Sequence, residues 1–502
     1  MKTLKAFKIN TTVFVLTLNL VLMNCTEKDN SLTVEVFETS KAGSLFSTIE
    51  TSNLKEADAV IQLLPEQTFQ TLTGIGGSFT ESSAYLLNQL SEANRQKIIE
   101  AYFGDDGAKY SLTRTHINSC DFSLSNYSYA SVEGDINLEH FSIEEDRDDI
   151  IPMIKDAMKI SSEGFNIIAS PWTAPPWMKD NKEWPGGKLL PEYNQTWALF
   201  FSKYLEAYKN EGINIWGITV ENEPLGNDNN WESMHFTAEE MTDFVEQYLG
   251  PQLRQTNPEV KILGYDQNRG DELKHWVDTM FRDENSSQFF DGTAVHWYAS
   301  TYDYFPESLQ YAHYKAPNKY LIQTEGCVDA EVPVWRNDDW YWEKEATDWG
   351  WTWAREEDKY LHPKYAPVTR YANDMIGCFN NWVDGWVDWN MILDRQGGPN
   401  WFENWCVAPV IVDTKADEVY FTPLYYVMKH FSKYLRPGAK RIGFEVSDDD
   451  LKVTAFQNPD NSVVVIVFNE FETPKTFQIK LQEQSKTVKI NPQSLQTVVI
   501  KT

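Results

Sequence analysis

Residues 215–224 read Ile-Trp-Gly-Ile-Thr-Val-Glu-Asn-Glu-Pro, a short apolar run that ends in two acids, an amide and a proline. Its β-branched and aromatic residues favour a buried strand, and the proline ends that strand. The same pattern recurs along the chain, with helical sequence after each run, at residues 72–79, 110–118, 165–172, 260–268, 290–298, 319–326 and 382–390. Eight buried strands that alternate with helices predict an α/β fold, a (β/α)8 TIM barrel, over residues 72–430.

Two helix starts in this region carry the capping-box pattern, in which a hydroxyl residue is followed three positions later by Glu. They are Ser142 with Glu145 and Thr237 with Glu240, and each precedes a segment of apolar periodicity. The predicted barrel is longer than the ~250 residues typical of this fold, so its loops are expected to carry insertions.

Both chain ends differ from the barrel because they contain alternating or β-branched runs with Asn-Pro and Asp-Asn turns. These runs are residues 33–37, 451–456, 463–468 and 476–481. They predict an additional β-sandwich domain beside the barrel, built from residues 31–71 and 431–502.

The charge balance excludes several classes of partner. The 502 residues contain 44 Lys plus Arg against 74 Asp plus Glu, a formal net charge of −30. Nucleic acid and anionic lipid surfaces need cationic clusters, so neither is expected as a partner. Aromatic residues make up 14% of the chain and include 19 Trp. Aromatic rings with a polar edge suit the apolar faces of neutral sugars.

The N-terminus carries an export signal. Three lysines precede an apolar run at residues 12–23, which is too short to span a bilayer. The run ends at Asn24-Cys25, which resembles a bacterial lipoprotein signal with residues 1–24 removed and Cys25 lipidated. Asn24 departs from the small residue usual at that position, and an ordinary secretory signal is the alternative. We expect a bacterial cell-envelope protein that meets the membrane only through this anchor.

Metal and cofactor motifs are missing from the sequence. The remaining cysteines show no CxxC and no histidine spaced for zinc; they are Cys120, Cys327, Cys378 and Cys406. HExxH, G-x-S-x-G, a phosphate-binding loop and an EF-hand loop are likewise missing. We therefore predict no metal and no cofactor; the sequence does not predict an oligomeric state.

Two glutamates end predicted strands on opposite sides of the barrel mouth. Glu223 follows the fourth strand, and Glu325 ends the seventh strand, 102 residues later. Three β/α units of roughly 31–35 residues each span that separation, and barrel active sites lie at these strand ends. Paired carboxylates are what glycosidic cleavage needs, one as acid and the other as nucleophile or base. Arg114 is predicted to keep Glu325 ionised, and burial with like charge to keep Glu223 protonated.

Other strand-end residues extend this prediction. His296 and Tyr298 point the same way by the period of two, towards the sugar and the nucleophile, or else are half-buried parts of the barrel wall. Asp121, Asn222 and Asn390 could pair with sugar hydroxyls or act as turn residues. The segment Trp335–Trp353, with six Trp, is expected partly to pack on the barrel and partly to stack on sugar units.

Several of these motifs together resemble glycoside hydrolase family 30, and most closely its glucosylceramidase and endo-β-1,6-glucanase branches. They are residues 119–123, 170–177, 217–224, 294–298, 387–390 and 397–401. The resemblance implies a clan A barrel with a β-sandwich and a retaining mechanism, with Glu223 as acid/base and Glu325 as nucleophile. It also implies a glucose subsite lined by Arg114, Asp121, Trp172, Asn222, His296, Tyr298 and Trp389. Cys120 and Cys327 match free thiols near the site, so no disulfide is expected there.

The Trp-rich segment has no counterpart in the animal lysosomal enzyme and lies where a loop would shape the leaving-group side. Together with the lipoprotein signal, this places β-1,6-glucan first as substrate and glucosylceramide second, with xylan or another β-linked sugar as a further alternative. If Asp121 holds the terminal glucose, cleavage is exo; otherwise endo cleavage is open. The rival from another class is a glycan-binding lipoprotein without catalysis.

Overall fold

The computed structural model describes residues 31–51, 56–300, 303–328 and 366–501. The predicted signal with Cys25 and the segment Trp335–Trp353 lie outside these residues. Within the described ranges, no helix has the length and apolar content that crossing a bilayer requires.

The predicted barrel is confirmed. In the described chain, eight parallel strands close in the order β10-β11-β4-β5-β6-β7-β8-β9. Their bounds are Gly74–Phe79 for β4, Leu112–Ile117 for β5, Asn166–Pro171 for β6, Gly217–Thr219 for β7, Lys261–Asn268 for β8, Gly292–His296 for β9, Tyr320–Glu325 for β10 and Gly385–Asp388 for β11. Six buried side chains from different strands fill the barrel below the site; they are Leu112, Ile168, Leu263, Ala294, Ile322 and Val387.

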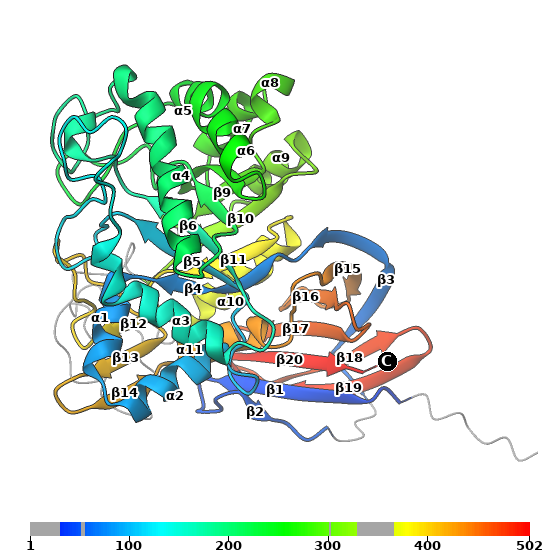
Figure 1. The fold of residues 1–502 in the computed structure, drawn as a ribbon. Coiled ribbons are helices and arrows are strands. Elements are labelled where there is room, and N and C mark those ends of the chain that lie inside the picture. Colours follow the sequence, from blue (N-terminus) through cyan, green and yellow to red (C-terminus); the bar gives the residue numbers. More distant parts are fainter. Residues whose placement is uncertain (1–30, 52–55, 301–302, 329–365, 502) are drawn as a thin grey trace, which may run out of the picture.

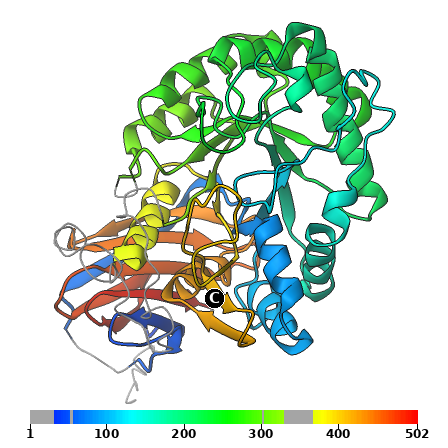
Figure 2. The same cartoon turned by 90° about the vertical axis from the view of Figure 1, so that its left-hand side faces the viewer.

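Helices surround the barrel on its outer side (Figure 2). They are α1 (Glu81–Gln89), α2 (Glu92–Phe103), α3 (Ile150–Ile160), α4 (Asn194–Asn210), α5 (Ala238–Phe244), α6 (Gly250–Thr256), α7 (Glu272–Met280), α8 (Glu284–Ser287), α9 (Pro306–Lys315), α10 (Ala366–Asn380) and α11 (Pro423–Ser432). A π-helical turn at Val245–Leu249 joins α5 to α6.

One of the two predicted capping boxes is present. Thr237 accepts a hydrogen bond from the Glu240 amide, and the Glu240 side chain accepts one from the Thr237 amide. The prediction at Ser142 is wrong, because only a short 3₁₀ turn, Glu144–Arg147, follows it. Ser142 Oγ instead accepts from the amide of Glu144, two residues on. The helix α3 begins later, at a cap formed by Asp149.

The predicted sandwich built from both chain ends is also confirmed. In the described residues its nine-stranded sheet has the order β19-β18-β3-β15-β16-β17-β20-β1-β2 (Figure 1). The strands are β1 (Val34–Ser40), β2 (Ser47–Thr48), β3 (Ala59–Thr71), β15 (Lys440–Val446), β16 (Leu451–Gln457), β17 (Val463–Asn469), β18 (Lys475–Leu481), β19 (Gln484–Ile490) and β20 (Ser494–Ile500). β1 pairs antiparallel with β20, so the two ends of the described chain form neighbouring strands of this sheet.

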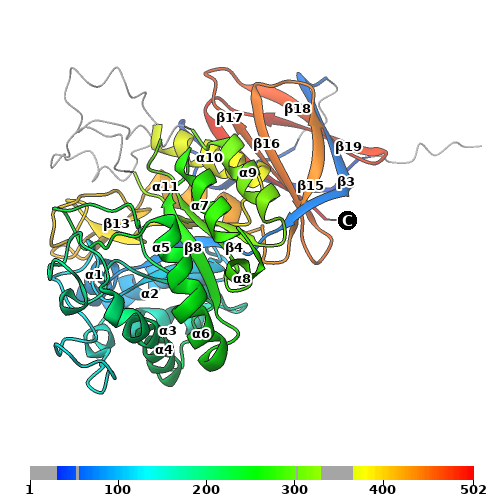
Figure 3. The same ribbon diagram turned by 90° about the horizontal axis from the view of Figure 1, so that it is seen from above.

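The helices α10 and α11 lie between the barrel and this sheet (Figure 3). A small sheet of β12 (Ile392–Asp394), β13 (Val410–Asp413) and β14 (Glu418–Phe421) stands beside α1. The loop between β12 and β13 follows the end of β11, so it reaches the strand ends where the candidate site lies.

A glycine allows the first barrel strand to approach its neighbour closely. A Cβ added to Gly76 on β4 would clash with the carbonyl oxygen of Leu112, the first residue of β5. Because that contact is with backbone, the clash cannot be relieved by turning a side chain. The closure of the barrel at β4 therefore depends on the missing side chain.

We predict that Gly76→Ala lowers the free energy of unfolding by about 2–4 kcal/mol, through overpacking against fixed backbone. Gly270→Ala is the control, because its added Cβ meets only Ala299 Cβ, at 3.8 Å. The measurement is the urea unfolding midpoint of both variants. Equal shifts for the two variants would contradict the close-approach argument.

Candidate active site

The two predicted carboxylates lie at the C-terminal ends of barrel strands. Glu325 is the last residue of β10, and Glu223 follows β7 by four residues. Glu223 has a φ of 48°, in the left-handed region that non-glycine residues rarely adopt. Its amide donates to the carbonyl of Asp266, at 2.9 Å, which holds this turn against the end of β8. Backbone strain of this kind commonly marks a functional position.

Arg114 on β5 is the fully buried centre of the site. Its Nη1 donates to Glu325 Oε2, and its Nη2 donates to Asn222 Oδ1 at 2.8 Å and to Asp266 Oδ2 at 2.7 Å. Its Nε donates to Ser170 Oγ at 3.0 Å. One guanidinium thus connects the ends of β6, β8 and β10 and the turn after β7.

Asp266 on β8 is the second centre, and it is not among the site residues predicted from the sequence. Its Oδ1 accepts from Thr324 at 2.6 Å and lies 3.0 Å from His296 Nε2, while its Oδ2 accepts from Thr219 at 2.7 Å as well as from Arg114. Burial acts to raise the pKa of Asp266, but Arg114 and His296 outweigh it and hold that pKa well below its usual range. Asp266 is therefore a permanent anion.

His296 joins this anion to Glu223. Its Nε2 faces Asp266, and its Nδ1 lies 3.3 Å from Glu223 Oε1. Burial lowers the pKa of His296, but the carboxylates of Glu325 and Asp266 raise it more, to about 9. At pH 7 the imidazole is a cation that donates from Nε2 to Asp266 and from Nδ1 to Glu223.

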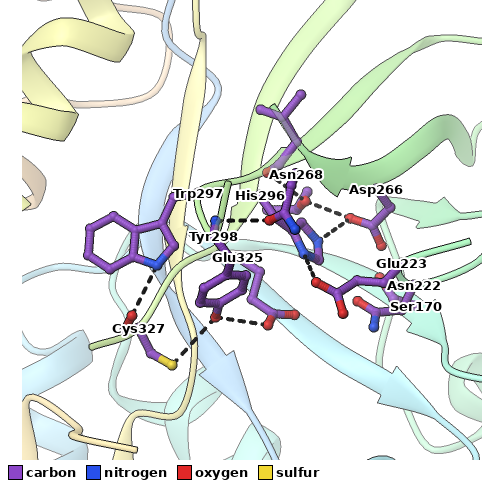
Figure 4. Close-up of polar contacts among 12 residues, drawn as sticks. Ser170, Asn222, Glu223, Asp266, Asn268, His296, Trp297, Tyr298, Glu325 and Cys327 are labelled. Atoms are coloured by element: carbon purple, nitrogen blue, oxygen red, sulfur yellow. Dashed lines mark hydrogen bonds and ion pairs between the residues drawn. The ribbon is translucent and has the colours of Figure 1, made fainter. Parts of the chain in front are cut away.

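Glu325 accepts on both oxygens. Arg114 donates to Oε2. Tyr298 Oη donates to Oε1 at 3.0 Å (Figure 4). The predicted Arg114 pair is present, but its predicted effect on ionisation is too simple. Burial raises the pKa of Glu325 above its usual value, and the opposing charges of His296 and Arg114 only reduce that rise.

Tyr298 is fixed from two sides. Its amide donates to Asn268 Oδ1 at 2.9 Å, and its hydroxyl lies 3.4 Å from Cys327 Sγ as well as beside Glu325 (Figure 4). His296 and Tyr298 both reach the site, as the period of two predicts, although β9 ends at His296.

The remaining predicted site residues form the wall beside this network. Trp172 and Trp389 stack with ring centroids 5.2 Å apart, and the Arg114 guanidinium lies 4.9 Å from the centroid of Trp172. Asp121 Oδ2 accepts from Asn404 Nδ2 at 3.1 Å, while its buried Oδ1 has no hydrogen-bond partner in the described structure. Burial, and then Glu325, raise the pKa of Asp121 well above its usual range.

The structure therefore brings all nine predicted residues to one end of the barrel, together with residues that were not predicted. Asp266 lies in the predicted strand 260–268, and its position near the end of that strand could have identified it as a site residue. Asn404, in the loop between β12 and β13, gave no comparable signal. Asn390 instead accepts from Thr80, at 2.8 Å.

The described residues hold no group of three or more His, Cys, Asp or Glu side chains arranged for a metal ion. The cysteines within them are buried free thiols, at Cys120, Cys327, Cys378 and Cys406. The site thus presents two carboxyl groups, Glu325 beside Arg114 and Glu223 beside His296. One is nearly enclosed and held by Arg114 and Tyr298, and the other is partly open to solvent and contacts His296.

Comparison with known proteins identifies both domains. The model of the glycosyl hydrolase family 30 TIM-barrel domain matches residues 72–435, and that of the family 30 β-sandwich domain matches residues 438–498.

Individual relatives come from two branches. The lysosomal acid glucosylceramidase of Mus musculus is 34% identical over 82% of this chain and 77% of its own length. Among solved structures, SrfJ from Salmonella typhimurium has a TM-score of 0.82 and 30% identity, and covers 94% of this chain and 100% of its own. The endo-β1,6-glucanase BT3312 has a TM-score of 0.78 and 28% identity, and covers 93% and 100%. With both domain models matched and relatives of this identity, the chain belongs to glycoside hydrolase family 30.

Proposed function

We propose that this family 30 glycoside hydrolase is a retaining, lipid-anchored β-glucanase of the bacterial envelope, with β-1,6-glucan as its substrate. The catalytic proposal rests on Glu223 and Glu325, which follow β7 and end β10 and are linked through His296, Asp266 and Arg114. Glu223 touches His296, and Glu325 is held by Arg114 and Tyr298.

In the proposed first step, Glu325 attacks the anomeric carbon while the bond to the leaving oxygen breaks. Glu223 donates its proton to that oxygen, and a covalent glycosyl–enzyme forms. In the second step Glu223 takes a proton from water, whose oxygen displaces Glu325. Arg114 and Tyr298 orient Glu325 for attack, and His296 holds Glu223 in reach of the leaving oxygen.

The preference for a glucan rests on the leader sequence and on charge. A lipid at Cys25 would tether the enzyme where outside polysaccharide is captured, and a net charge of −30 disfavours anionic substrates. The structural likeness to an endo-β1,6-glucanase supports the same linkage. Glucosylceramide is the second candidate, because the mouse glucosylceramidase is 34% identical and the glucanase 28%.

The carboxylate of Asp121 affects the choice between exo and endo cleavage of the glucan. One oxygen is engaged by Asn404, and the other is buried without a hydrogen-bond partner among the described residues. A sugar hydroxyl that donates to this oxygen would remove an unpaired buried acceptor. A terminal glucose held in this way would favour exo cleavage.

We predict different losses for the two glutamates. Glu325→Gln removes the nucleophile and lowers kcat/KM on the order of 10³-fold or more on every glucoside. Glu223→Gln removes the acid and lowers kcat/KM about 10²–10⁴-fold on β-1,6-glucan, but much less on an aryl glucoside with an acidic phenol, which leaves without protonation. The aryl substrate should give a burst of phenol in this variant, because water is no longer activated.

Circular dichroism and thermal melting of both variants check that they fold. Unchanged glucose release by Glu325→Gln would overturn the nucleophile assignment. Glucan binding in a wild-type protein that shows no turnover on any glucoside would favour the rival, a glycan-binding protein.

We predict a bell-shaped pH profile whose acidic limb depends on His296. Attack needs ionised Glu325, so kcat/KM falls as the pH drops through the pKa of that carboxyl group. The charge of His296 lowers this pKa. His296→Asn therefore raises it and moves the acidic limb to higher pH. Because the pKa of His296 is about 9, the wild type keeps this charge at neutral pH and loses it as the pH rises through that value.

The measurement is kcat/KM against pH for an aryl β-glucoside. His140→Asn is the control, because this imidazole is exposed and paired only with Asp135 in the described structure. An acidic limb that stays in place or moves to lower pH in His296→Asn would show that the imidazole does not act on the nucleophile.

The substrate is tested by incubating the protein with linear β-1,6-glucan and resolving the products by size over time. We expect cleavage. A ladder of oligosaccharides would mean an open cleft, whereas glucose alone would mean that Asp121 closes on the chain end. Cleavage of glucosylceramide or an aryl glucoside, without any product from the glucan, would overturn the polysaccharide assignment and leave the catalytic one standing.

A further inference from the structure

A buried apolar cluster that includes Trp172 and Trp389 of the site wall contains two sulfur atoms in contact. The cluster consists of Cys120, Phe122, Trp172, Cys327, Trp389, Leu393, Cys406 and Ala408. Within it, the Sγ atoms of Cys327 and Cys406 are 3.1 Å apart. Both side chains are almost fully buried, with 1% and 5% of their surfaces exposed. A disulfide needs the sulfurs to move closer by only about 1 Å, to ~2.05 Å.

The backbone sets this proximity. Val328 and Val407, the residues that follow the two cysteines, form an antiparallel β-bridge. In an antiparallel pair, residues that lie diagonally across the bridge point to the same face, so both thiols enter the same cluster. The Cys406 amide also donates to the Gly397 carbonyl at 3.0 Å, which fixes that side of the pair. The backbone therefore brings the two cysteines to one face of the bridge, where their side chains can meet.

We propose that Cys327 and Cys406, where the sequence led us to expect no disulfide, are a redox modification site that closes to a disulfide while the exported chain folds, before burial encloses the two thiols. The oxidant is a second disulfide, in a thiol–disulfide oxidoreductase or in oxidised glutathione. One cysteine thiolate attacks that disulfide and forms a mixed disulfide, and the other thiolate then displaces the partner. One S–S bond forms in this chain and one is lost from the oxidant, which leaves as two thiols with the two protons and two electrons.

The site lies next to the proposed nucleophile. Cys327 is two residues beyond Glu325, and its Sγ lies 3.4 Å from the Tyr298 hydroxyl that donates to Glu325. Cys406 is two residues beyond Asn404, which donates to Asp121. The disulfide would join the end of β10 to the loop between β12 and β13, and so would clamp together the two segments that carry Glu325 and the Asp121 contact. It would also leave no S–H group beside Tyr298.

The other two cysteines have different surroundings and serve as internal controls. The Cys378 sulfur lies 2.8 Å from Arg269 Nη1 and 3.4 Å from Asp374 Oδ2, within a buried ion pair. The Cys120 sulfur accepts from Ser123 Oγ at 3.9 Å. Among the described residues neither sulfur has a second sulfur as a hydrogen-bond neighbour, so both should remain thiols under the same treatment.

The first test is peptide mapping of the full-length protein after it has been reduced, unfolded in urea and refolded in the presence of oxidised glutathione. The sample is unfolded in urea with iodoacetamide and digested without reductant. We expect a cross-linked peptide containing Cys327 and Cys406, two hydrogen atoms lighter than the sum of its parts, and alkylated Cys120 and Cys378. Alkylation of both Cys327 and Cys406 would overturn the proposal.

The second test asks whether the disulfide stabilises the fold, by thermal melting with and without dithiothreitol. We expect reductant to lower the Tm of the oxidised wild type by a few degrees, because the cross-link restricts the unfolded chain. Cys406→Ala should not respond to reductant, whereas the control Cys120→Ala, in the same cluster, should keep the response. A Tm of the wild type that is the same in both conditions, or an equal response in Cys406→Ala, would overturn the clamp.

Discussion

The burial of the Arg114 guanidinium is the constraint on which the rest of the site depends. A cation with no exposed surface must find its hydrogen-bond partners inside the protein, and four groups from separate strand ends provide them. Loss of one partner from a buried ion pair typically costs about 3–5 kcal/mol, because the other charge stays buried and unpaired. The strand ends of β6, β8 and β10 are therefore held in register by the same contact that positions Glu325. Stability and catalytic geometry are not separable at this residue.

A second consequence concerns charge. The chain is strongly acidic as a whole, yet the site matches its buried carboxyl groups, Asp266 and Glu325, with Arg114 and protonated His296. The anion of Asp266 keeps His296 protonated, and the charge of His296 in turn favours the ionised form of Glu325. Burial raises the pKa of Glu325, and the two cations reduce that rise. The proposed nucleophile therefore depends for its ionisation on the cations that contact the network.

The sequence was sufficient for the architecture and for the residues at strand ends, because both follow from periodicity. Eight apolar runs with helical sequence between them leave few topologies, and strand order then puts Glu223 and Glu325 at one end of the barrel. Asp266 could have been found by the same rule. The contact of Asp121 with Asn404 and that of Cys327 with Cys406 could not, because each joins a strand end to a loop far along the chain. No local pattern encodes the path of that loop.

This division also explains how one site can serve different substrates. The residues that we propose to hold the sugar ring and the scissile bond stand at strand ends, where the barrel and Arg114 fix their positions. The group beyond that bond would then meet the loops that follow the strands. Among the described loops, the one between β12 and β13 enters the wall through Asn404. A change in substrate therefore needs no change in the charged network, and the substrate assignment has to be sought in these loops rather than in the two glutamates.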